Sequence, residues 1–126
     1  MLGRQTRSQA LWKDSKTMNN KVIVVFSACP DETVARQLGR RLVESGKAAC
    51  VNVIPGLHSV YRWQDKVEEA SEAMMLIKTV EERVGEITAW LEQEHPYDLP
   101  ELVALPVVAG LPGYLEWVVD ATASHR

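Results

Sequence analysis

The feature that most constrains the fold is a pair of long extended arms between Ala48 and Thr79. The first arm is rich in β-branched and aromatic residues, and the second alternates side chains between two faces, which is typical of β-strands. Gln64 and Asp65 stand between the arms, and Asp tolerates the positive φ that a two-residue turn requires. The pattern predicts a β-hairpin whose arms are about 15 residues long.

Such a hairpin is too long to be covered by its own domain. An arm of about 15 extended residues spans roughly 50 Å, whereas a compact domain of this size has a radius of gyration of only ~14 Å. A lone two-stranded ribbon is marginally stable in water, and its open edges pair with other chains. We therefore expect an oligomer whose subunits share their hairpins, with a bend or bulge where Pro55 and Gly56 interrupt the first arm.

The chain has the length and composition of one globular domain. It has 126 residues, of which 46% are hydrophobic and 25% charged, and no apolar run approaches the ~20 residues of a membrane span. The net charge is −3, but residues 1–20 hold four basic residues and one acidic residue, so the rest of the chain is acidic. An acidic body argues against nucleic acid as the main partner and is compatible with cations.

Two elements are expected before the hairpin. The continuous apolar run at 21–28 predicts a buried strand. Apolar residues at four-residue spacing then predict a helix at 32–45, which Asp31 can cap and Gly46 can stop.

Three more elements are expected after the hairpin. Thr79 and Glu82 have the spacing of a capping box, so the second helix should begin there and end near Glu94. An apolar run at 101–108 predicts a last strand, and a short final helix follows at 114–121.

The order of these elements is β-α-β-β-α-β, which is the ferredoxin-like arrangement of an α+β protein. Both main helices should cover one face of the sheet, and we expect other subunits to cover the second face. The predicted division is a disordered tail at 1–20, a domain at 21–122 and a short tail at 123–126.

The two cysteines, Cys29 and Cys50, do not have the spacing of a metal-ligand pair. We interpret them as buried thiols in a reducing compartment, which predicts a cytoplasmic protein. The first 20 residues lack the continuous apolar segment of a signal peptide. No phosphate-binding loop or nucleophile motif is present, so we do not expect an enzyme.

The ordered set of short motifs resembles the CutA family of divalent-cation tolerance proteins over about residues 21–122. The matching motifs are Ala48-Ala49-Cys50-Val51-Asn52, Pro55-Gly56, Ser59, Tyr61, Trp63, Lys66-Val67-Glu68, Glu72, Lys78-Thr79, His95-Pro96-Tyr97, Pro100-Glu101, Leu105-Pro106, Gly110, Tyr114 and Trp117. One departure is Asp65, because the family usually has Gly before the hairpin Lys. The resemblance implies a homotrimer of ferredoxin-like subunits with interlocking hairpins, and an association with tolerance to copper and other divalent cations.

The resemblance also implies a copper site at the end of the first strand. In bacterial members copper ligation is attributed to a Cys at that strand end and to a His-His pair before Pro-Tyr, and the aligned residues here are Ser27, Glu94 and His95. Cys29 lies two residues after Ser27, so in a strand its side chain points the same way. The candidate metal ligands are therefore His95, Glu94 and Cys29, with copper as the expected metal.

Two interpretations of His95 stay open. It can be a histidine at a helix C-terminus that satisfies backbone carbonyls, or it can be a metal ligand. Cys50 likewise fits a core or interface thiol as well as a ligand site.

A second set of aromatic and charged residues fits either packing between subunits or a cleft that binds a small ligand or cation. The set comprises Cys50, Tyr61, Trp63, Lys66, Glu68, Glu72, Tyr97, Asp98 and Trp117. Our hypothesis is a homotrimeric divalent-cation tolerance protein that binds copper or another divalent metal. The alternatives are a signalling or small-molecule-binding trimer of the nitrogen-regulatory PII type, and a scaffold trimer without a ligand.

Overall fold

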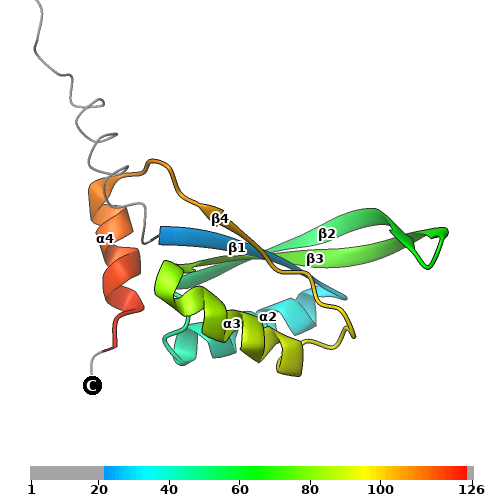
Figure 1. Cartoon of the computed structure of the whole chain (residues 1–126), viewed down its shortest axis with the longest axis horizontal. Coiled ribbons are helices and arrows are strands. Elements are labelled where there is room, and N and C mark those ends of the chain that lie inside the picture. The colour runs from blue at the N-terminus through cyan, green and yellow to red at the C-terminus, as the bar shows by residue number, and fades with distance from the viewer. Residues whose placement is uncertain (1–21, 125–126) are drawn as a thin grey trace, which may run out of the picture.

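The computed structural model describes residues 22–124, so the tail predicted at 1–20 lies outside the described residues, as do the last two residues. Four strands form one antiparallel sheet with three helices around it (Figure 1). The elements are β1 (Val22–Cys29), α2 (Glu32–Glu44), β2 (Cys50–Trp63), β3 (Lys66–Val80), α3 (Glu81–Glu94), β4 (Val103–Pro106) and α4 (Pro112–Ala121). The predicted α+β class and the β-α-β-β-α-β order are confirmed.

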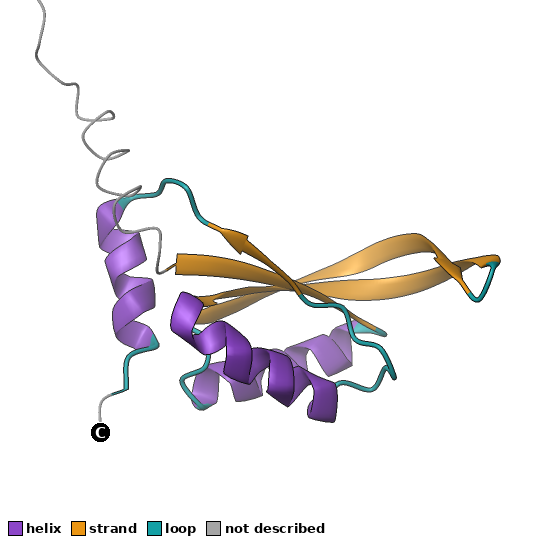
Figure 2. Cartoon of the chain, in the orientation of Figure 1, coloured by secondary structure: helices purple, strands orange, loops and turns teal. Residues whose placement is uncertain are grey.

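The sheet has the strand order β2-β3-β1-β4. Helices α2 and α3 both cover one of its faces, while α4 lies across the end of the sheet where β1 begins (Figure 2). The β2–β3 hairpin continues well beyond the helices and the other two strands. One end of the sheet thus carries α4, and the other is a bare two-stranded ribbon.

The core lies between the sheet and helices α2 and α3. Successive side chains of a strand point to opposite faces, and the core side of the sheet carries Val25, Met75 and Ile77, none of which is accessible to solvent. They pack in one cluster with Leu42 and Leu91 from the helices. The alternation of side chains along the two central strands, β1 and β3, therefore decides which sheet face α2 and α3 cover.

The hairpin has the two irregularities that the sequence predicts. Gln64 and Asp65 form the connecting turn with φ of 51° and 66°, which places two non-glycine residues in the left-handed region. The pairing register shifts between Ile54 and Leu57, and Gly56 between them has a φ of 74°. The predicted turn and bulge are both confirmed.

The ends of the first helix also agree with the prediction. Asp31 accepts a hydrogen bond from the backbone N–H of Val34 at 2.9 Å, which satisfies one free donor of the first turn. Gly46 follows the helix with a φ of 78°, and its N–H and that of Lys47 donate to carbonyls of the last turn. This is the Schellman arrangement, for which the positive φ is required.

The capping box predicted at Thr79 is wrong. The residue before α3 is Val80, and no side chain caps this helix. The buried Thr79 hydroxyl instead donates to the carbonyl of Lys47 at 2.7 Å. Thr79 thus belongs to the end of β3, where a long-range bond competes with the local cap.

The last strand is shorter than predicted. It spans Val103–Pro106 instead of 101–108, and it pairs with β1 only. Pro106 stands at its end, where a missing N–H donor is tolerated on an edge strand. The final helix begins at Pro112, two residues before the predicted start, with Pro in its first turn.

Candidate functional site

His95 lies at the end of α3 and reaches to the end of β1. It is 5% exposed, and its Nε2 lies 2.8 Å from the carbonyl oxygen of Ala28. Its Nδ1 accepts a hydrogen bond from the backbone N–H of Tyr97 at 3.1 Å. Both ring nitrogens are therefore occupied by partners within the subunit.

Tyr97 connects His95 to the hairpin. Its hydroxyl donates to Oε2 of Glu72 at 2.5 Å, and its ring lies 4.8 Å from the His95 ring between centroids. Burial, followed by the hydrogen bond to Glu72 and the Glu72 charge, raises the pKa of Tyr97. The phenol therefore remains a donor to a carboxylate at neutral pH.

Cys29 ends β1 in the same region. Its side chain is inaccessible to solvent, and burial raises its pKa to about 12, with further contributions from the charges of Glu72, Asp31 and Glu101. It is therefore a neutral thiol near neutral pH.

Ser27 points to the same side of β1 and is also inaccessible to solvent. Its hydroxyl oxygen has no hydrogen-bond partner among the described residues. The end of β1 thus holds two buried, uncharged side chains at the position where the resemblance implies a copper ligand.

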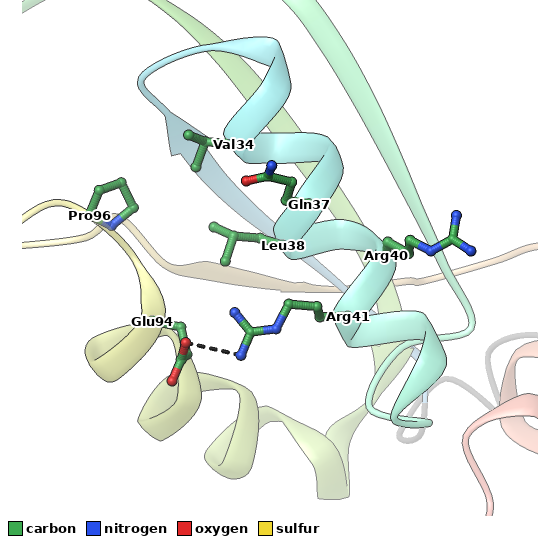
Figure 3. A pocket seen from close by; sticks show the side chains of 7 residues that line it. All are labelled: Val34, Gln37, Leu38, Arg40, Arg41, Glu94 and Pro96. Atoms are coloured by element: carbon green, nitrogen blue, oxygen red, sulfur yellow. Dashed lines mark ion pairs between the residues drawn. The ribbon is translucent and has the colours of Figure 1, made fainter.

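Glu94 points into a different part of the molecule. Its carboxylate pairs with Arg41 of α2, with 3.0 Å between Oε1 and Nη2 (Figure 3). The pair bridges a shallow open groove between α2 and the end of α3. The groove is lined by Val34, Gln37, Leu38, Arg40, Arg41, Glu94 and Pro96.

The three candidate metal ligands are not gathered around one point in the subunit. Both ring nitrogens of His95 have hydrogen-bond partners, Cys29 is buried, and Glu94 pairs with Arg41 of α2. Across residues 22–124, no group of three or more His, Cys, Asp and Glu side chains is placed to hold a metal ion.

The cleft candidates of the hairpin share one face. Because side chains alternate along a strand, Lys66, Glu68 and Glu72 of β3 point to the same side. Trp63 pairs with Lys66 across the strands, and Tyr61 pairs with Glu68. The two aromatic side chains are 46% and 45% exposed. The hairpin therefore presents a mixed aromatic and charged surface to solvent.

A second group lies at the other end of the same sheet face. Cys50 pairs with Lys78 across β2 and β3. The Lys78 ammonium lies 5.7 Å from the centre of the Tyr114 ring, and that ring lies 5.6 Å from the Trp117 ring. Lys78 and Lys66 are twelve residues apart along β3, which corresponds to about 40 Å of extended strand.

We name these groups by their place in the fold. The hairpin group is Tyr61, Trp63, Lys66, Glu68 and Glu72, with Tyr97 bound to Glu72, and the α4 group is Cys50, Lys78, Tyr114 and Trp117. Asp98 is exposed in the loop after α3 and belongs to neither group. The residues predicted for one cleft therefore fall mainly into two groups, which lie apart within a single subunit.

An apolar band separates the two groups on this face. Ile54 and Leu105 are each 46% exposed and Val103 is 49% exposed, while Phe26 and Leu76 are half-buried. The strand pairing puts all of them on the side opposite α2 and α3. Helix α4 covers the end of this face, where Val22 and Val80 pack against Leu115 and Val118. Among the other elements of residues 22–124, none lies over the rest of the face.

Sequence reasoning did not include Lys78 and Tyr114 among the cleft candidates. The sequence contains a signal for Lys78: it lies an even number of residues from Lys66 and Glu68 in the same strand, so its side chain points to the same face. It also missed Arg83, whose guanidinium donates to the carbonyl of Thr122 at 3.0 and 2.8 Å and so fixes the end of α4 against α3.

The model of the CutA1 divalent ion tolerance protein family matches residues 23–121. The chain belongs to this family. The match covers every strand and helix described above except the first residue of β1, and it includes both groups on the open sheet face.

Individual relatives agree with the family match. The chain is similar to protein CutA of Mus musculus, with 46% identity over 103 residues, which cover 82% of this chain and 58% of the mouse protein. It is 43% identical over 99 residues to the divalent-cation tolerance protein CutA of Thermus thermophilus, covering 79% of this chain and 96% of that protein. The chain thus spans little more than half of its mouse relative and nearly all of its bacterial relative.

A solved structure of the divalent cation tolerance protein Cut A1 from Thermus thermophilus has the same fold. The TM-score is 0.79 at 42% sequence identity, covering 81% of this chain and 99% of the other. No helix within residues 22–124 has the length and apolar character needed to cross a membrane.

Proposed function

We propose that this chain is a homotrimeric divalent-cation tolerance protein whose ligand site is a cleft between subunits. The observation that carries the proposal is the separation of the hairpin group and the α4 group on the sheet face opposite α2 and α3. Within one subunit they lie at opposite ends of β3, whereas neighbouring subunits can bring the hairpin of one against α4 of the next.

The uncovered part of this face supports an assembly of this kind. Exposed contiguous apolar surface marks protein–protein contacts, and here Ile54, Val103 and Leu105 form such a band between two polar ends. A contact between two different ends is heterologous, and it closes into a ring when the rotation between subunits allows it. Three subunits are the number that the family resemblance implies.

The cleft also supplies the chemistry for a cation. Glu68 and Glu72 bring carboxylates on the hairpin, and Cys50 brings a free thiol that is half-buried on the α4 side. Carboxylate together with sulfur from a second subunit suits a divalent cation of borderline softness, such as copper or zinc. We therefore propose the cleft, rather than the end of β1, for the metal.

A second candidate is a small-molecule-binding or signalling trimer of the PII type that uses the same cleft. It is favoured by exposed aromatic rings and amines in both groups: Trp63 pairs with Lys66 on the hairpin, and the Lys78 ammonium lies over the Tyr114 ring beside α4. Aromatic faces and amines together suit a planar anion. In both versions we propose a binding protein rather than an enzyme. We also propose a reducing, cytoplasmic location, because both cysteines are free thiols.

Two measurements test the proposal. Light scattering on the purified, reduced protein should give three times the chain mass, and a monomer would overturn the assembly. Calorimetry with Zn²⁺ and Cu²⁺ should then show micromolar or tighter binding that Glu68→Gln and Cys50→Ser both weaken.

Glu69 provides the matched control for this titration. It is next to Glu68 but points to the other face of the hairpin, where it contacts His58 at 2.7 Å. Glu69→Gln should therefore leave metal affinity unchanged. If metals do not bind and organic anions raise the melting temperature, the second candidate replaces the first.

A further inference from the structure

The hydrogen bonds at the end of β1 form a continuous chain toward the hairpin. The chain starts at the carbonyl of Ala28, passes through the His95 ring to the backbone of Tyr97, and ends where the Tyr97 hydroxyl meets Glu72. Glu72 belongs to the hairpin group. The buried strand end and the proposed cleft are therefore connected by three successive hydrogen bonds.

The partners determine which nitrogen of His95 carries its proton. A carbonyl oxygen only accepts, so Nε2 donates to Ala28. The Tyr97 backbone N–H only donates, so Nδ1 is the acceptor and carries no proton. This tautomer uses both nitrogens and leaves no lone pair for a metal ion.

We propose that His95 is a positioning residue, whose neutral ring ties the loop after α3 to the end of β1 and so holds the Tyr97 phenol against Glu72. The ring restricts the backbone of Tyr97 through Nδ1, and the contact between the two rings restricts the direction of the phenol. The result is a Glu72 carboxylate fixed on the face that carries the hairpin group. The inference rests on the proposed function only for the use of Glu72 in a cleft.

The first test needs no variant. Long-range ¹⁵N–¹H spectra of the ¹⁵N-labelled protein above neutral pH distinguish the two tautomers of each histidine. His95 should show the form with hydrogen on Nε2, and added Zn²⁺ should leave its two nitrogen signals in place. The other tautomer, or a Zn²⁺-induced shift of either His95 nitrogen, would overturn the proposal.

Two variants test the hydrogen bonds of the two His95 ring nitrogens one at a time. In His95→Gln the amide can still donate to Ala28 from the position of Nε2, but the acceptor for Tyr97 is lost. In His95→Asn the amide oxygen can replace Nδ1, while the donor to Ala28 is lost. Hydrogen exchange of the Tyr97 amide should become about tenfold faster in His95→Gln and change less in His95→Asn.

A double-mutant cycle tests whether His95 acts through Tyr97. Tyr97→Phe and Glu72→Gln should be coupled in the unfolding of the wild-type protein, and this coupling should be largely lost in the His95→Gln background. Equal coupling in both backgrounds would contradict a positioning role. His58→Gln is the control, because His58 contacts Glu69 on the other hairpin face.

These results are independent of the proposed function. The tautomer and the Tyr97 amide report on contacts within one subunit, whereas light scattering and metal titration of the same samples report on the assembly and the cleft. A monomer with the expected tautomer would contradict the trimer alone, and a trimer with the opposite tautomer would contradict the positioning role alone.

Discussion

The hydroxyl of Tyr97 donates a 2.5 Å hydrogen bond to the carboxylate of Glu72. This bond joins the loop after α3 to the hairpin just beyond the end of β1, where Cys29 pairs with Ala73. From this point the hairpin has no further strand beside it among the described residues. The bond therefore supports the ribbon where it leaves the sheet.

Tyr97→Phe should destabilise the protein by about 1–2 kcal/mol, because a partly buried carboxylate loses its donor. Urea unfolding measures the loss, and His58→Gln is the control, with an expected change near zero because the contact between His58 and Glu69 is exposed. Equal effects of the two substitutions would contradict the role of the Tyr97–Glu72 bond.

The same bond predicts a loss of stability in alkali. The pKa of Tyr97 is raised in the folded state, so above its unfolded value of about 10 the native protein holds a proton that the unfolded chain releases. The free energy of unfolding should therefore be unaffected by this group below that pH and should fall as the pH rises above it. Tyr97→Phe should show a weaker fall, and an unchanged slope would contradict the prediction.

Cys29 should resist alkylation in the native protein, because it is inaccessible and its pKa is raised to about 12. Iodoacetamide labelling of Cys50→Ser, followed by mass spectrometry, isolates this thiol. Little label is expected near neutral pH until denaturant is added. Rapid labelling without denaturant would show that the strand end opens.

Gly39→Ala should lower the free energy of unfolding by about 1 kcal/mol, because the added Cβ would come within 2.9 Å of Cγ1 of Val51. Gly85 is the control: it also lies in a helix, but an added Cβ meets nothing within 4 Å. Gly85→Ala should stabilise the protein by roughly 0.5–1 kcal/mol. Thermal or urea unfolding of both variants should therefore give shifts of opposite sign.

Asp65→Gly should stabilise the hairpin by about 0.5–1 kcal/mol, because Asp65 has a φ of 66° and glycine adopts this region without strain. Ser71→Gly, in the middle of β3, should instead destabilise by roughly the same amount. Unfolding measurements that give both substitutions the same sign would contradict the strain at the turn.

The hairpin, its turn and its bulge could be predicted because their signals are local. Gln64-Asp65 and Pro55-Gly56 are neighbours in the chain, and their preferred φ values act within the same few residues. The capping box failed because Thr79 bonds to Lys47, which lies 32 residues away and across a strand boundary. A local pattern cannot show which of two partners a hydroxyl chooses.

The candidate site was predicted less completely for the same reason. His95 could be singled out as a histidine at a helix end, but its partner at Nε2 is a backbone carbonyl 67 residues earlier in the chain. Residue type alone does not reveal that both nitrogens are occupied. The separation of the cleft set also required the strand register, since Cys50 and Trp63 belong to one strand and lie at its opposite ends.

The separation of the two groups has a genetic consequence. In the proposed ring, a Trp63→Ala subunit damages the cleft that its hairpin enters, and a Trp117→Ala subunit damages the cleft beside its α4. A trimer built from only one of these variants therefore has no intact cleft. A mixed trimer nevertheless has one position where an unaltered hairpin meets an unaltered α4, so two inactive alleles expressed together should complement each other.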